Sequence, residues 1–183
     1  MLYSESPWKR IVPKVTSDVT DRDKDLLDKV IKQFDVKNSP RYRRNQQGKN
    51  ETYCNIFLWD VTIALNTEIP HWVDANNNAT TTLKGARELN ANSIVNWMKT
   101  YGVQRGWTPV KQDEALNYAN KGKPVVVLWK NPKGIGHVAI VRPGKMHPTK
   151  GIPIAQAGSI NFDDLYLADG FGSRKDLVFY AHE

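Results

Sequence analysis

The apolar pattern of this chain changes period near residue 124, and this change restricts the fold more than any other feature. Before residue 124, apolar residues recur at helical spacing in several segments. After it they gather in short β-branched runs, such as residues 124–129, which is typical of buried strands. Helices followed by strands that short turns connect predict an α+β domain with an antiparallel sheet.

The same patterns predict individual elements. Helices are expected over residues 20–34, 53–65, 91–101 and 111–120, with Thr52 capping the second and Gly102 ending the third. Strands are expected over residues 124–129, 137–141, 152–157 and 177–181, the first two as a hairpin, while residues 162–172 stay open. Residues 1–20 are expected to be an irregular arm, and residues 21–183 a single domain.

Cys54 is the only cysteine in the 183 residues. A single thiol excludes an intramolecular disulfide and any zinc site built on several thiolates. Free cysteine is among the most buried residue types, so an inert core residue is one interpretation. The other is a nucleophile, because Cys54 opens a helical pattern and the amides of a first helical turn favour the thiolate.

His137 begins a predicted strand, with Gly136 before it and Ala139 two residues later. A single histidine on a sheet is commonly a hydrogen-bonded structural residue. Small neighbours, however, leave room for another segment to approach the imidazole, which would then serve as a base for a thiol.

A catalytic histidine needs a third group that fixes its orientation. The next predicted strand contains Gln156 among small and apolar residues, where a polar amide is costly unless it is hydrogen-bonded. Asn161 and Asp169 are alternatives for this role. Gln156 is equally explained as a residue that ties down backbone at the end of a sheet.

Three short stretches together resemble the NlpC-type and CHAP-type branch of papain-like cysteine peptidases and amidases, which hydrolyse peptidoglycan. The stretches are Tyr53-Cys54-Asn55, Gly136-His137-Val138-Ala139 and Ala155-Gln156-Ala157-Gly158. In the order of elements the resemblance covers about residues 40–181. It implies a papain-like fold, in which N-terminal helices, with the nucleophile at a helix N-terminus, pack on a C-terminal antiparallel sheet.

The resemblance also implies roles for individual residues. Cys54 would be the nucleophile, His137 the base and Gln156 the orienting group, although glutamine departs from the residue that many members carry. The Cys54 amide would contribute to an oxyanion hole, and Tyr42, Gln47 or Asn50 would supply its second donor. No metal or cofactor is expected. The candidate substrate-binding residues are Tyr42, Tyr53 and Trp72.

The chain carries a net charge of +7, much of it between residues 37 and 49. A basic surface attracts polyanions, so an anionic cell-wall polymer is a candidate partner, although a solvated loop explains the charge equally well. Nucleic acid is not expected, because aromatic and basic residues do not interleave as they do in known readers. His71 is not expected to be a metal ligand or a second base.

The favoured function is therefore a cysteine amidase or endopeptidase that acts on peptidoglycan or its stem peptides. The alternatives are a papain-like hydrolase of another amide or ester, and a non-catalytic basic binding module with Cys54 buried. Residues 1–7 lack the apolar stretch of a secretory signal, and no apolar run reaches the roughly 18 residues of a membrane span. We expect synthesis in the cytoplasm and action on the wall after phage-type lysis or specialised export.

Overall fold

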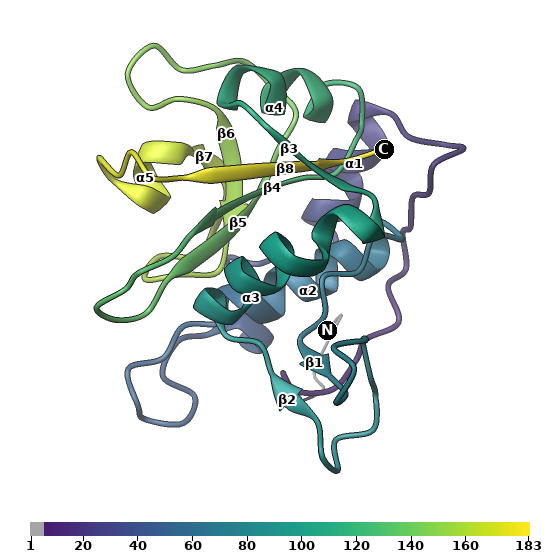
Figure 1. Cartoon of the computed structure of the whole chain (residues 1–183). Coiled ribbons are helices and arrows are strands. Elements are labelled where there is room, and N and C mark those ends of the chain that lie inside the picture. Colours follow the sequence, from purple (N-terminus) through teal and green to yellow (C-terminus); the bar gives the residue numbers. More distant parts are fainter. Residues whose placement is uncertain (1–5) are drawn as a thin grey trace.

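In the computed structural model, which describes residues 6–183, five α-helices surround a six-stranded antiparallel sheet, and this confirms the predicted α+β class (Figure 1). The helices are α1 (Lys24–Lys32), α2 (Cys54–Ala64), α3 (Ala91–Trp97), α4 (Gln112–Ala119) and α5 (Leu167–Phe171). The strands are β1 (Trp72–Val73), β2 (Arg87–Glu88), β3 (Trp107–Val110), β4 (Val125–Trp129), β5 (His137–Val141), β6 (Pro153–Gln156), β7 (Phe162–Tyr166) and β8 (Val178–His182).

The main sheet has the strand order β3-β8-β4-β5-β6-β7, and β1 and β2 form a separate ribbon. β4 and β5 are the predicted hairpin, with Val126 opposite Ile140 and Trp129 opposite His137. Beyond Ala155, β6 pairs no further with β5. The start of β5 is therefore open on that side, next to the segment that carries Cys54.

The helices cover both faces of this sheet: α4 lies on one side, and α2 and α3 lie side by side on the other (Figure 1). Ten of the eleven residues of α2 are buried, so this helix has no wet stripe and its sequence shows no amphipathic period. α1 instead buries Leu27, Val30 and Ile31 and exposes its charged side to solvent. The core thus lies between the sheet and α2, and the first residue of α2 is at its edge.

Two predictions of local structure are wrong. Gly102 does not end the third helix, because α3 continues through a π-helical turn (Met98–Gly102) and a 3-10 turn (Val103–Arg105) to Gly106, whose φ is +83°. Thr52 does not cap α2: the N-cap is Tyr53, and no side chain caps that end. Strand β3 was not predicted, since Pro109 interrupts its pattern. Residues 162–172, left open by the sequence, form all of β7 and α5.

Residues 6–20 contain no helix or strand, yet they are attached to the body of the molecule. The Ser17 amide donates to the carbonyl of Ala64 at 2.9 Å. The amides of Lys14 and Val15 both donate to Gln33 Oε1 at 3.0 Å. This segment therefore follows the surface of α1 and α2 as an ordered strap.

A buried ion pair fixes the beginning of that strap. The guanidinium of Arg41 binds the Asp60 carboxylate in a bidentate manner, at 2.6 and 2.9 Å, and also donates to the carbonyls of Ser6 and Lys9, each at 2.9 Å. Tyr42 donates to the same carboxylate at 2.7 Å. Arg41, expected in a basic loop, is thus a core residue, and its charge is not on the surface.

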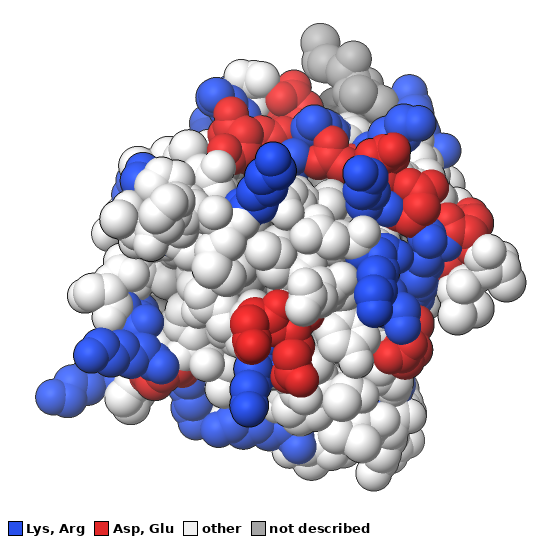
Figure 2. All heavy atoms as spheres, turned by 90° about the horizontal axis from the view of Figure 1, so that it is seen from above, with Lys and Arg blue, Asp and Glu red and all other residues white. Residues whose placement is uncertain are grey.

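Figure 2 shows how the remaining charge is distributed on the side of α4. Acidic and basic side chains interleave along the upper rim, and basic side chains predominate along the lower edge. None of the helices in residues 6–183 combines the length and the apolar character needed to cross a bilayer.

Candidate active site

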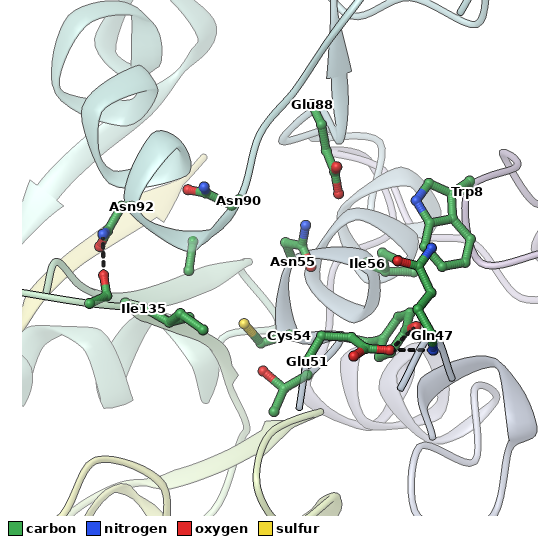
Figure 3. A pocket seen from close by; sticks show the side chains of 15 residues that line it. Trp8, Gln47, Glu51, Cys54, Asn55, Ile56, Glu88, Asn90, Asn92 and Ile135 are labelled. Carbon is green, nitrogen blue, oxygen red and sulfur yellow. Dashed lines mark hydrogen bonds between the residues drawn. The ribbon is translucent and has the colours of Figure 1, made fainter. Parts of the chain in front are cut away.

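Cys54 is the first residue of α2 and lines a cavity of about 330 Å³ (Figure 3). The cavity lies between the N-terminus of α2, the loop before it, residues 88–92 and the turn at residues 134–136. Only 3% of Cys54 is exposed. A molecule that occupies the cavity would therefore meet the sulfur at the cavity wall.

The surroundings of the sulfur act on its pKa in opposite directions. Burial raises the pKa of Cys54, whereas the amides of Val138 and Asn55 and the hydroxyl of Thr52 lower it. Burial prevails, so the pKa is raised and the thiol is neutral in this conformation. The amides at the helix N-terminus favour the thiolate as expected, but desolvation outweighs them.

His137 is held by Gln156 from the neighbouring strand. Its Nε2 lies 2.6 Å from Gln156 Oε1, and Gln156 Nε2 donates to the carbonyl of Ile160 at 3.0 Å. That second bond fixes the amide, so Oε1 can only accept and the histidine proton must be on Nε2. Nδ1 then keeps its lone pair, and it has no hydrogen-bond partner within residues 6–183.

The protonation of His137 follows from the same surroundings. Burial lowers its pKa, the hydrogen bond that it donates to Gln156 raises it, and the positive charge of Arg174 lowers it, with a net decrease. The ring also packs against Phe171 of α5, at 4.8 Å between centroids. The site therefore holds a neutral imidazole with a free Nδ1.

Cys54 and His137 reach the start of β5 from different elements. The sulfur approaches from α2 and contacts the amide of Val138, the residue that follows His137. Gly136, just before His137, packs too closely for a side chain, since a Cβ there would lie 2.4 Å from Asn92 Oδ1 and 2.6 Å from the carbonyl of Trp129. The structure thus brings all three candidate catalytic residues to one end of β5.

The two alternatives to Gln156 are used elsewhere. Asn161 donates to the carbonyls of Val36 and Tyr42 and accepts from the Gly158 amide. Asp169 is bonded to Lys150 and to the amide of Tyr166. Neither of them contacts the imidazole through these bonds.

The candidate substrate-binding and oxyanion residues separate into two groups. Tyr53 and Gln47 line the cavity. Tyr42 is fully buried against Asp60 and Phe57, so it cannot contact a substrate. Trp72 lines a separate depression. Asn50 accepts from Arg44 and is not among the residues that line the cavity.

Two residues that the sequence did not indicate line the cavity. Trp8, on the strap, packs edge-on against Tyr53 at 5.8 Å between centroids. Glu88, at the end of β2, points into the cavity toward Asn55 (Figure 3). No sequence signal identifies either, because both are distant from Cys54 in the chain.

His71 forms a buried cluster behind this wall. Its ring stacks on Trp59 at 5.2 Å, and its Nδ1 lies 3.3 Å from Asn55 Nδ2. Burial, together with the charge of Arg41, lowers the pKa of His71 to about 3. Among residues 6–183, no three His, Cys, Asp or Glu side chains are grouped so that they could hold a metal ion.

No known family model matches this chain, and no curated protein matches it.

Proposed function

We propose that this chain is a cysteine hydrolase that cuts amide bonds in bacterial cell-wall peptidoglycan through an acyl-enzyme, with a papain-like arrangement of its site. One observation carries the proposal: the 2.6 Å contact between His137 Nε2 and Gln156 Oε1. This contact leaves Nδ1 of His137 as the basic nitrogen. The Cys54 sulfur reaches the same end of β5, where it contacts the amide of Val138.

The proposed reaction starts from a neutral Cys54 thiol and a neutral His137 imidazole. Nδ1 of His137 takes the thiol proton as the sulfur of Cys54 attacks the amide carbon, and the carbonyl oxygen becomes an oxyanion. The amide of Cys54 stabilises that oxygen, and Gln47, on the cavity wall, is the second donor. The imidazolium then protonates the leaving amine, which leaves a thioester. Water, activated by the same Nδ1, hydrolyses the thioester and restores the thiol.

The wall as substrate rests on the motif resemblance and on the net charge of +7. Stem peptides are the expected ligands. An anionic wall polymer would contact the lower edge in Figure 2, where basic side chains predominate. No cofactor takes part in the proposed steps. The enzyme would be made in the cytoplasm and reach the wall after phage-type lysis or by specialised export.

A digest of purified wall tests this function. We expect the wild type to release soluble fragments with new amino and carboxyl termini, identified by mass spectrometry. Cys54→Ala and His137→Ala should release none, while Asp164→Asn, which changes an exposed carboxylate on β7, should match the wild type. Intact wall in every sample would refute the wall as substrate, and cleavage of another amide or ester would identify the alternative hydrolase.

The low exposure of Cys54, 3%, favours one rival function, a non-catalytic binding module. Thiol alkylation separates the two. Because burial raises the pKa of Cys54, we expect slow alkylation of the native protein near pH 6 that accelerates as pH rises. Alkylation only after denaturation would support the binding module. Rapid alkylation near pH 6 would instead indicate a preformed ion pair and would contradict the neutral pair.

A further inference from the structure

We propose that the cavity beside Cys54 binds a protonated amino group of the substrate, held by the Glu88 carboxylate and by Oδ1 of Asn55. This inference rests on the proposed function, since it specifies the class of peptide that would be cut. It concerns a wall of the cavity that the catalytic steps do not use.

The orientation of Asn55 follows from three acceptors around its nitrogen. Asn55 Nδ2 donates to the carbonyl of Leu89 at 3.1 Å, lies 3.3 Å from His71 Nδ1, and also faces the Glu88 carboxylate. A flipped amide would set Oδ1 against the Leu89 carbonyl, so the flip is excluded. His71 is therefore a positioning residue, whose proton is on Nε2, 3.5 Å from Glu88 Oε1.

The oxygen of Asn55 is consequently free to accept. Asn55 is 8% exposed and lines the cavity, and its Oδ1 has no hydrogen-bond partner among the described residues. An amide oxygen without a protein partner among the described residues, on a nearly buried residue of the cavity wall, favours a ligand that donates to it.

Glu88 supplies the charge. Its side chain is 44% exposed and is directed at Asn55 in Figure 3. The other carboxylate on the cavity wall, Glu51, already accepts from the amides of Gln47 and Lys49 and from the Tyr53 hydroxyl, so it is committed to its own loop. Glu88 is thus the carboxylate available to a ligand.

The rest of the cavity agrees with a cationic ligand. In a chain of net charge +7, none of the described residues that line this cavity is a lysine or an arginine. The aromatic rings of Trp8 and Tyr53 also line it, and aromatic faces attract ammonium groups. A peptide could supply such a group as its N-terminal amine or as the side-chain amine of a diamino acid.

Binding to Cys54→Ala tests the proposal independently of hydrolysis. Calorimetric titration would compare three forms of one wall-derived stem peptide: unmodified, acetylated at the N-terminal amine, and acetylated at the side-chain amine. We expect one of the two acetylations to weaken binding about tenfold or more, and the weakened form identifies the amine that is bound. Adding Glu88→Gln should remove this preference, while adding Asp164→Asn should keep it.

The outcomes separate the two proposals. Equal binding of the three peptides, no binding, or a preference that survives Glu88→Gln would overturn the amine site. Hydrolysis by the wild type without any preference for a free amine would leave the proposed function and overturn this inference. A preference that depends on Glu88, without hydrolysis by the wild type, would support the amine site and overturn the proposed function.

Discussion

At the scale of single residues, the amide of Gln156 determines which nitrogen of His137 can act as a base. Gln156 is 1% exposed, and both ends of its amide are bonded, to His137 and to Ile160. Such a fixed amide holds the imidazole in one tautomer without adding charge. The site is therefore organised around a neutral histidine.

Replacing Gln156 tests this role. Gln156→Leu removes the acceptor, and we expect kcat/KM on wall peptides to fall by about 10²–10⁴-fold. Gln156→Glu keeps the acceptor and adds a negative charge, which favours the imidazolium and raises the pKa of His137. The acid limb of the pH–rate profile should then move to higher pH. An unmoved limb, or a fully active Gln156→Leu, would contradict the assigned role.

Gly170 offers an indirect test, because it contacts neither the sulfur nor the cavity. A Cβ at this position would lie 2.2 Å from Gln156 Oε1 and 3.0 Å from Ile154 Cδ1. Gly170→Ala should therefore displace the amide and lower kcat more than KM.

Gly102→Ala is the matched control. Its Cβ would meet neighbours at 3.6 Å, which is ordinary contact, and its activity should equal that of the wild type. Equal activity of the two variants would show that the position of Gln156 does not matter.

The sequence indicated Cys54, His137 and Gln156 as candidates because each begins or interrupts a clear local pattern. It missed Trp8 and Glu88 because nothing local distinguishes them. It also misassigned Tyr42, whose hydroxyl donates a hydrogen bond to Asp60 in the core. Local pattern thus indicates which residues are unusual, whereas the residues that complete a cavity come from distant segments.

At the scale of elements, α2 joins the core to the site. Asp60, in the middle of this helix, binds Arg41, and Arg41 holds the carbonyls of Ser6 and Lys9 on either side of Trp8. The helix that begins at Cys54 therefore also anchors the strap that forms one wall of the cavity. The apolar character of residues 53–65 predicted α2 but not this anchor, since Arg41 lies in a stretch that reads as a solvated basic loop.

Removing the anchor should affect stability and substrate binding together. Arg41→Ala leaves the Asp60 carboxylate buried without its cation, and we expect the free energy of unfolding to fall by about 3–5 kcal/mol. Urea denaturation measures this change.

Arg10→Ala is a control, because it removes an exposed ion pair with Glu68 from the same strap, and its cost should be about 1 kcal/mol or less. Equal losses in the two variants would show that the buried pair does not anchor the strap.

At the scale of the whole molecule, the order of helices and strands predicted the α+β class, and the central hairpin is formed as expected. The edges of the sheet were not predicted. β3 and β7 are edge strands, and edge strands need less apolar alternation because their outer side meets solvent. The folding of residues 6–20 onto the domain also depends on contacts distant in sequence.

The buried His71 makes stability depend on pH. Its pKa is about 3 in the folded state, against about 6.5 in the unfolded chain. The unfolded state therefore binds a proton that the folded state excludes, so this contribution is complete above pH 6.5 and is lost as pH falls toward 3. The loss should be about 1.4 kcal/mol per pH unit.

Urea denaturation at pH 7.5, 5.5 and 4.5 measures this slope. His71→Asn should be less stable than the wild type at pH 7.5, but its stability should fall less steeply with acid. Parallel pH dependence of the two proteins would show that His71 is not buried in its neutral form.

The central claim is that the Cys54 sulfur is a nucleophile served by His137. Acid-quenched reactions with wall-derived stem peptides, digested and mapped by mass spectrometry, would detect a thioester on the peptide that contains Cys54. We predict this acyl group in the wild type, and its absence or much slower formation in His137→Ala. Hydrolysis that proceeds in Cys54→Ala, or a thioester that forms equally fast without the imidazole, would contradict the claim.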